Sequence, residues 1–465
     1  MNKETVTTTT PPLPTFRQAF LVWAKVGVMS FGGPAGQIAL MHRMLVDERR
    51  WIGEQRFLHA LSYCMLLPGP EAQQLAVYIG WLMHGLRGGL AAGILFVLPG
   101  ALVMLGLSAT YALYHDLGAV HALFLGVKAV VLAIVVEAIL RIGKRALKNR
   151  AAVAIAVAAF IGIYVLKVPF PLIVLGAGLV GWIGHRLAPA AFPGAAGPHG
   201  SKGNGKDAPD TKGMVDALIE SGGLIHTRRS TARALRTLAT WLIIWLGPIL
   251  ALRLATGGAS VWTQIGEFFS VMAVVTFGGA YAVLAYVAQA AVDSFHWLMP
   301  REMVDGLGLA ETTPGPLILV LQFVGFLAAF RSPGALDPLL AGVLGAVLTL
   351  WATFAPCFLW IFVGAPYVEA LRGNKSISAA LAAVTAAVVG VIANLALWFA
   401  LHVLFRETRD FALAGLTWPV PVLGSIDWLT AAIAIAAMIA MLRFKVGALP
   451  TLGFGALAGL ATLLL

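Results

Sequence analysis

The sequence is poor in cysteine and in charged side chains. Cysteine accounts for 2 of 465 residues, and Asp, Glu, Lys and Arg together for 11%, whereas an average soluble domain has about 25% charged residues. Cys64 and Cys357 have no other cysteine or histidine at ligand spacing. The pattern therefore supports no disulfide framework, zinc site, haem or other cofactor, and predicts two buried free thiols. A redox enzyme would lack the centre that it needs.

Long apolar runs dominate what is present. Hydrophobic residues make up 59% of the chain, and the runs reach about 20 residues, the length that crosses a bilayer core. They predict an all-α polytopic membrane protein. Lys and Arg outnumber Asp and Glu by 32 to 21, but the basic residues cluster in loops beside the apolar runs, where they set topology. We therefore expect lipid, and no nucleic acid, around the protein.

The chain contains one unit written twice. A shift of 246 positions aligns Phe31-Gly32-Gly33 with Phe277-Gly278-Gly279, and Pro68-Gly69-Pro70 with Pro314-Gly315-Pro316, without a gap. After an insertion near 331–341 the register becomes 257, which aligns Glu137 with Asn394. Such long-range self-similarity indicates two homologous halves.

The repeat defines the domain boundaries. We expect a cytoplasmic tail (1–15), a first repeat (16–187), a cytoplasmic linker (188–234), a connecting transmembrane helix (235–256) and a second repeat (257–465). The linker is rich in Gly, Pro, Ser and Lys, so it is predicted to be mostly disordered. Its basic end, HTRRSTARALR, favours a short amphipathic helix on the membrane surface.

Each repeat predicts the same series of helices. The expected ranges are 16–46, 55–84, 88–114, 119–142, 151–167 and 169–187 in the first copy, and 262–292, 302–330, 338–364, 378–404, 426–442 and 447–465 in the second. Six elements per copy and the connecting helix give about 13 transmembrane segments. An even number per copy, followed by one extra crossing, turns the second copy over, so the halves are predicted to be inverted repeats.

Charge bias indicates the orientation. Lys and Arg gather in 141–150 and in 186–236, and positive loops face the cytoplasm. The prediction is a cytoplasmic N-terminus and a periplasmic C-terminus. The arginines of 43–56 contradict this rule, and we interpret that segment as part of the scaffold of a site.

The Pro-Gly-Pro motifs predict helix breaks inside the membrane. Proline has no N–H and fixes its own φ, so a helix ends before such a motif and a new one begins after it. Residues 55–67 and 71–84 are each about 20 Å long as helices, too short to cross a bilayer. A re-entrant hairpin and a tilted broken helix both satisfy this pattern.

The motif-bearing segments 30–80 and 277–326 closely resemble the signatures of the chromate ion transporter family. The resemblance covers nearly the whole chain except the tail and the linker, and the two-copy layout is similar to the long-chain, bidomain branch. It implies 13 spans in a bacterial inner membrane and efflux of chromate, with sulfate as a competing analogue. Sulfate or another oxyanion as the physiological cargo, uptake, a passive anion channel and a homodimer all stay open, as do the coupling ion and its stoichiometry.

A tetrahedral dianion in a membrane needs buried donors, because an uncompensated charge is costly there. Helix N-termini supply N–H groups and about half a positive charge each, and glycine lets the backbone approach a ligand closely. Half-helix starts from both copies are predicted to converge on one pocket. The candidate substrate-binding residues are Ser30, Gly32, Gly33, Pro34, Gln37, Pro68, Gly69, Pro70, Gln74, Thr276, Gly278, Gly279, Thr312, Thr313, Pro314, Gly315 and Pro316, with Lys25 and Lys128 as candidate cations.

Three acids are candidates for proton coupling. Glu71 and Glu311 flank the two Pro-Gly-Pro motifs, where a carboxylate is stabilised by the helix dipole but repels an anion. Protonation and anion binding would then be linked thermodynamically. Glu137 is the third candidate, although Arg141 four residues later also predicts a simple ion pair on one helix face.

Overall fold

A computed structural model describes residues 14–31, 33–115, 117–192, 213–216, 225–227, 229–277, 280–367, 375–413 and 416–464. It is almost entirely helical. The helices of the first half are α1 (Phe16–Met29), α2 (Gly33–His42), η1 (Arg43–Asp47), α3 (Glu54–Cys64), α4 (Glu71–Tyr114), α5 (Gly118–Ala146), α6 (Arg150–Tyr164) and α7 (Phe170–Leu187), and η3 (Ile225–Thr227) precedes the connecting helix α9 (Thr231–Thr256).

The second half has the same order of elements. Its helices are α10 (Val261–Val275), α11 (Ala280–Gln289), η4 (Ala290–Ser294), α12 (Pro300–Thr312), η5 (Leu317–Leu319), α13 (Val320–Arg331), α14 (Pro338–Gly364), η6 (Ala365–Tyr367), α16 (Lys375–Leu404), α17 (Trp428–Leu442), α18 (Ala448–Ala461) and η8 (Thr462–Leu464), with a short 3-10 turn η7 (Leu423–Ser425) before α17. Among the described residues, six helices are long and apolar enough to cross a membrane, and six shorter apolar helices accompany them.

The helix breaks lie where glycine and proline predicted them. The ranges 16–46 and 262–292, expected as continuous elements, are each divided at the Phe-Gly-Gly motif. Each of them ends in a π-helical turn, η1 and η4, and residues with positive φ follow at Arg50 and His296, which the 246 register aligns. The backbone therefore repeats itself in detail as well as in outline.

Helix α4 contains a sharp corner at the boundary that the sequence predicted between the ranges 55–84 and 88–114. His84 and Gly85 have non-helical backbone angles, and Gly85 has a φ of +60°, which favours glycine. The two arms of α4 then pack antiparallel, with Gly80 and Gly88 so close that a Cβ on either would overlap the other's carbonyl oxygen. The first arm, residues 71–83, thus returns toward the end of the protein from which α3 enters.

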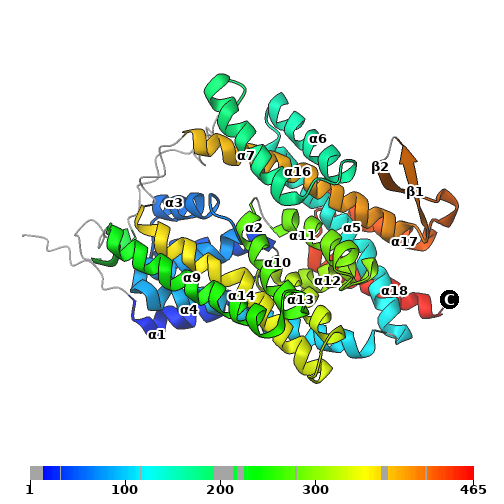
Figure 1. Cartoon of the computed structure of the whole chain (residues 1–465), viewed down its shortest axis with the longest axis horizontal. Helices are drawn as coiled ribbons and strands as arrows, with labels where there is room; N and C mark the ends of the chain where they lie inside the picture. The colour runs from blue at the N-terminus through cyan, green and yellow to red at the C-terminus, as the bar shows by residue number, and fades with distance from the viewer. Residues whose placement is uncertain are drawn as a thin grey trace, which may run out of the picture.

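Helix α1 lies along the second arm of α4. Phe16 packs against His84 with ring centroids 5.7 Å apart, and Gly27 abuts the carbonyl of Leu95. Both contacts advance by eleven residues, so the two helices run in parallel and α1 stops near the middle of the longer helix. Figure 1 places α1 near one end of the longest axis and the C-terminus near the other.

Three sequence expectations need correction. The basic segment before residue 235 does not form a separate surface helix, because α9 begins at Thr231. The all-α prediction missed a β-hairpin between α16 and α17, made of β1 (Thr408–Leu413) and antiparallel β2 (Leu416–Pro421), which Figure 1 shows beside α17.

The third correction concerns the linker. Residues 193–212 lie outside the described residues, but 213–216 form an ordered contact that we call the strap. Val215 is fully buried, and its N–H donates to the carbonyl of Trp51 at 3.0 Å. Asp216 accepts the N–H of Gly53 at 2.7 Å and pairs with Arg56. This part of the linker therefore packs against the start of α3.

Candidate functional site

The four motif loops meet in two crossed pairs. The N–H of Gly69 donates to the carbonyl of Thr276 at 2.7 Å, and the N–H of Gly315 donates to the carbonyl of Ser30, also at 2.7 Å. Each Pro-Gly-Pro loop therefore binds the loop that precedes Phe-Gly-Gly in the other copy. The structure brings together the segments that the sequence predicted would converge, and we call this arrangement the crossed loops.

Glycine is required at both Pro-Gly-Pro positions. The φ angles are +117° at Gly69 and +90° at Gly315, a region that L side chains rarely adopt. A Cβ at Gly69 would also lie 2.9 Å from Gln74 Nε2 and 3.0 Å from Cys357 Sγ. The sequence predicted that these glycines let the backbone approach a ligand closely; in the structure their own N–H groups bind carbonyl oxygens of the opposite copy.

The candidate hydroxyl groups are also engaged. Ser30 and Thr276 donate to carbonyls one turn earlier in their own helices, at 2.6 and 2.5 Å. Thr312 and Thr313 donate to Leu309 and Ala310 at 2.8 and 2.9 Å. These four hydroxyl groups each donate to a carbonyl in the last turn of a helix. Their hydrogens are therefore not available to a ligand, and their oxygens can only accept.

The candidate amides bind backbone carbonyls. Gln37 donates to Gly315 at 2.6 Å and Gln74 donates to Pro68 at 2.7 Å. Only the nitrogen of a side-chain amide can donate to a carbonyl, so in each case the amide nitrogen must face the loop. The two side chains are fully buried and join α2 and α4 to the Pro-Gly-Pro loops. Pro34 is half-buried at the start of α2, while Gly32, Gly278 and Gly279 lie outside the described residues.

The N-terminus of α4 is a buried donor site. Helix α4 begins directly after Pro70 and no side chain caps it, so the N–H groups of Glu71, Ala72 and Gln73 have no partner within the helix. Gln73 is fully buried, and neither its amide nitrogen nor its amide oxygen has a hydrogen-bond partner among the described residues. Such a group is costly to bury unless something binds it.

Sequence reasoning missed Gln73, although the sequence contains a signal for it. The 246 register aligns Glu71, Gln73 and Gln74 with Leu317, Leu319 and Val320. The equivalent start in the second copy is thus entirely apolar and begins with the short turn η5. The polar chemistry is concentrated at one of the two Pro-Gly-Pro loops.

The three candidate acids have different surroundings. Glu71 is the first residue of α4. Glu311 accepts the hydroxyl of Tyr281 at 2.5 Å, and Glu137 pairs with Arg141 at 3.6 Å, as their spacing predicted. Of the three, Glu71 is the one that shares a helix N-terminus with Gln73.

The two candidate cations lie elsewhere. Lys25 is exposed on the outer face of α1. Lys128 is largely buried on α5, where its Nζ lies 3.2 Å from Asp305 Oδ1 of α12. Among the described residues, neither lysine is one of the groups that bind the crossed loops.

The thiols agree with their prediction. Cys64 and Cys357 are buried and free, and Cys357 lies beside Gly69. No group of three or more His, Cys, Asp or Glu among the described residues is arranged to hold a metal ion.

Comparisons with known proteins agree on one family. The family model described as "Chromate transporter" matches residues 17–182 and 263–460. A chromate transport protein of Pseudomonas aeruginosa is 32% identical over 396 residues, which cover 84% of this chain and 82% of the relative. A chromate transport protein of Cupriavidus metallidurans is 27% identical over 384 residues, covering 82% of each.

A shorter relative matches about a third of the chain. The transporter YwrB of Bacillus subtilis is 28% identical over 165 residues, which cover 34% of this chain and 83% of the relative. No solved structure matches the chain significantly.

Proposed function

Because the chain belongs to the chromate transporter family, we propose that it is a secondary transporter that exports chromate across the bacterial inner membrane, driven by protons or by the membrane potential. The family and the apolar helices establish a multi-pass membrane protein whose relatives are named for chromate transport. Export, the energy source and the location of the site are our proposal.

In this proposal chromate binds at the N-terminus of α4. Three backbone N–H groups and the amide of Gln73 supply donors without a full positive charge, which suits a dianion that must bind and then leave. The buried, unpartnered amide of Gln73 is the observation that carries the proposal, since a ligand rich in acceptor oxygens would satisfy it. The crossed loops hold this helix start in the interior.

Glu71 gives the site a means of coupling. Its carboxylate lies on the same first turn as the donors, so an ionised Glu71 and a bound dianion repel one another. Anion binding then favours protonated Glu71, and by linkage a proton favours the anion. Glu311 and Glu137 are secondary candidates, because each already has a partner in Tyr281 or Arg141.

We further propose that the two halves are inverted repeats whose motif-bearing helices form re-entrant hairpins. Support comes from the corner at His84. His84 binds the carbonyl of Pro14 at 2.9 Å, and the linker residue His226 binds the carbonyl of Trp81, also at 2.9 Å. The chain start, the linker and the return of α4 are therefore at one end, which we assign to the cytoplasm.

This arrangement changes the predicted count of crossings. If α1–α2, α10–α11, α12–α13 and the pair of α3 with the first arm of α4 all re-enter, each copy has four crossings, the second arm of α4 being one of them, and α9 adds one. The count per copy stays even, so the inversion and the periplasmic C-terminus remain as predicted from the sequence. The number of crossings falls from 13 to nine.

The test is uptake of labelled chromate by everted membrane vesicles, with a pH gradient and a membrane potential imposed separately. Saturable uptake that depends on one of these gradients supports the proposal. Competition by sulfate, molybdate and phosphate identifies the preferred oxyanion. Unsaturable flux that follows the anion gradient alone would indicate a passive channel, and uptake in right-side-out vesicles only would reverse the direction.

A further inference from the structure

A second buried polar cluster lies apart from the crossed loops, between the two repeats. Asp305 of α12 is 3% exposed. Its Oδ2 accepts the hydroxyl of Tyr111 of α4 at 2.8 Å, and its Oδ1 lies 3.2 Å from Lys128 Nζ of α5. Two consecutive helices of the first repeat and one helix of the second therefore direct one hydroxyl, one ammonium group and one acid to the same point.

One carboxylate oxygen of Asp305, Oδ1, has incomplete hydrogen bonding among the described residues. Oδ1 makes no hydrogen bond of normal geometry, although it faces Lys128. The neighbouring acid on α12, Glu302, is in contrast fully occupied: it accepts the N–H of Met299 at 2.7 Å and both guanidinium nitrogens of Arg331. Glu302 is held as a charged pair, while Asp305 has room for a proton on Oδ1.

The remaining titratable neighbour is a histidine at the end of α4. The ring of His115 stacks on that of Tyr111, with centroids 5.5 Å apart. The groups that face Asp305 are thus Lys128 from α5, Tyr111 from α4 and Glu302 from its own helix, while His115, directly after α4, lies behind Tyr111 and Arg331 from α13 lies behind Glu302.

The fold does not require this ion pair. The repeat registers align Asp305 with His59 and Lys128 with Thr385, so the residues at the symmetry-related pair of positions cannot form the same ion pair. A buried ion pair is no more stable than well-packed apolar residues of similar size, and ionisable groups inside a membrane are mostly functional. Retention of the pair at one of the two equivalent places between the repeats therefore indicates a role in transport.

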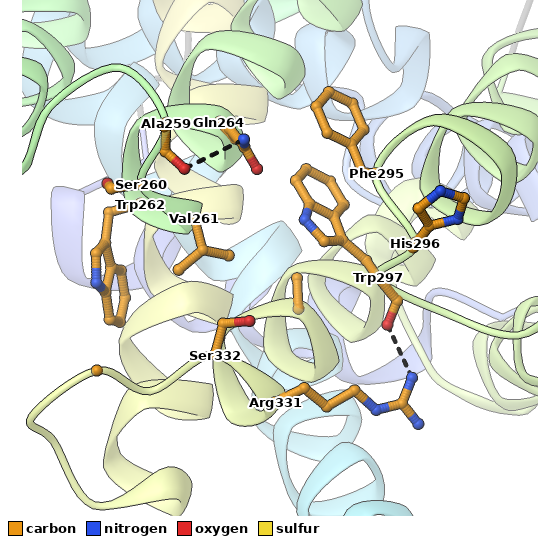
Figure 2. A pocket seen from close by; sticks show the side chains of 12 residues that line it. Ala259, Ser260, Val261, Trp262, Gln264, Phe295, His296, Trp297, Arg331 and Ser332 are labelled. Carbon is orange, nitrogen blue, oxygen red and sulfur yellow. Dashed lines mark hydrogen bonds between the residues drawn. The ribbon is translucent and has the colours of Figure 1, made fainter.

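The cluster is close to a surface cavity at the end of the protein opposite the linker. Helix α9 leads away from the linker for 26 residues, about 39 Å at 1.5 Å per residue. The residues that follow it line a cavity of about 370 Å³ together with Trp297 and Arg331. Figure 2 shows the Arg331 side chain at this cavity, bonded to the carbonyl of Trp297.

A short route joins this cavity to Asp305. Arg331 reaches from the cavity to Glu302, and Asp305 follows one helical turn deeper on α12. We propose that Asp305, with Lys128 and Tyr111, is a proton-binding site that exchanges with solution at the C-terminal end of the protein. This inference rests on the proposed function, for which it supplies a proton site distinct from the anion site.

The proposed step is simple. A proton from solution forms an O–H bond on Oδ1 of Asp305, and no other covalent bond breaks. Lys128 remains an ammonium ion, so the buried cluster gains one positive charge. After the anion has left, this added positive charge favours the change of the protonated transporter from its periplasm-facing to its cytoplasm-facing conformation.

Two variants separate a proton site from a structural ion pair. Asp305→Asn removes the acid, and Asp305→Asn with Lys128→Met removes both charges and leaves no unpaired lysine. In everted vesicles we expect both variants to catalyse chromate exchange without a gradient and to lose all stimulation by a pH gradient. Restoration of that stimulation in the double variant would show a structural pair and overturn the proposal. Asp337→Asn, an exposed N-cap at the same end, is the matched acid-to-amide control and should keep the stimulation.

A second readout does not depend on the cargo. Infrared difference spectra of the reconstituted wild-type protein between pH 5 and pH 9 should contain the C=O band of one buried carboxyl group that is absent from Asp305→Asn. Tyr111→Phe should move the midpoint of that band to higher pH, because a hydroxyl that donates to the ionised form favours it. An unchanged band in Asp305→Asn overturns the proton site, whether or not chromate is the cargo. Absence of chromate transport by the wild type with the band intact overturns only the proposed function.

Discussion

Replacing Gln73 by leucine should have opposite effects on stability and on binding. Gln73 is fully buried with both amide atoms unpartnered, and leucine of similar size occupies the aligned position 319. An unsatisfied buried polar group costs about 1–3 kcal/mol. Without ligand, Gln73→Leu should therefore be as stable as the wild type or more stable, with a higher midpoint of thermal unfolding.

The same substitution should weaken chromate binding. A hydrogen bond to a charged group contributes about 1.5–3 kcal/mol, and about 1.4 kcal/mol corresponds to a tenfold change in Kd. Loss of one such bond from Gln73 should raise the Kd for chromate about 10- to 150-fold. Isothermal titration calorimetry on purified protein in nanodiscs measures this Kd, and thermal unfolding of the same samples measures stability.

Gln322→Leu is the matched control. Gln322 is equally buried, but its amide donates to the carbonyl of Ala101 at 2.9 Å. This variant should unfold at a lower temperature, because it removes that bond between α13 and α4, and should bind chromate normally. An unchanged Kd in Gln73→Leu, or equal losses of affinity in both variants, would refute the assignment of the anion site to the start of α4.

Four further predictions concern coupling, the crossed loops, the linker and the topology. Two unit charges about 4 Å apart interact by about 4 kcal/mol at an effective dielectric of 20, and a dianion doubles this. Glu71→Gln should therefore preserve chromate binding and flatten its pH dependence between pH 5.5 and 8.5. If the pH profiles of chromate binding in the wild type and the variant superimpose, Glu71 is only a helix cap. Gly69→Ala and Gly315→Ala should each abolish efflux with protein still in the membrane, because positive φ costs a non-glycine residue about 1–3 kcal/mol and the crossed bonds depend on it; normal flux in either would contradict the crossed loops. Shortening 192–212 should leave transport in vesicles largely intact, since the strap lies beyond this range, and loss of efflux despite normal insertion would reveal a partner of that segment. A reporter that is active only in the cytoplasm should be silent when fused after Leu465, and strong activity there would contradict the inverted arrangement.

The local breaks of the chain were predictable from the sequence. Proline and glycine act on their own backbone, so the positions of the breaks at 68–70 and 314–316 follow from residue type alone. The ion pair of Glu137 and Arg141 has an equally local cause in helix geometry. These features need no knowledge of the tertiary structure.

The partners across the interior were not predictable. The bond from Gly69 to Thr276 joins two backbone groups, and every residue type carries the same N–H and carbonyl, so the sequence has no signal for it. Tyr111 and Asp305 are 194 residues apart, and only the packing of α4 on α12 brings them together. Gln73 was missed because Gln74 is adjacent, and the burial of each depends on the rotation of α4.

The β-hairpin and the strap were missed for a different reason. Residues 408–421 contain apolar residues in short runs, which resemble the neighbouring helices in composition. Val215 is a single apolar residue in a polar segment, and its complete burial depends on a surface offered by the first repeat. Composition describes the average of a segment and not the one residue that docks.

The strap also bears on how the two halves recognise each other. In the second repeat, Glu302 caps the start of α12 from within the same helix, whereas the start of α3 receives its acid, Asp216, from the chain that leads into α9. A break anywhere in 192–212 would leave this acid on the second half. Two separately synthesised halves would then still carry complementary parts of one contact, and the first half made alone would leave the carbonyl of Trp51 and the guanidinium of Arg56 without these partners. The strap would thus favour the association of a first half with a second half over the association of two identical halves.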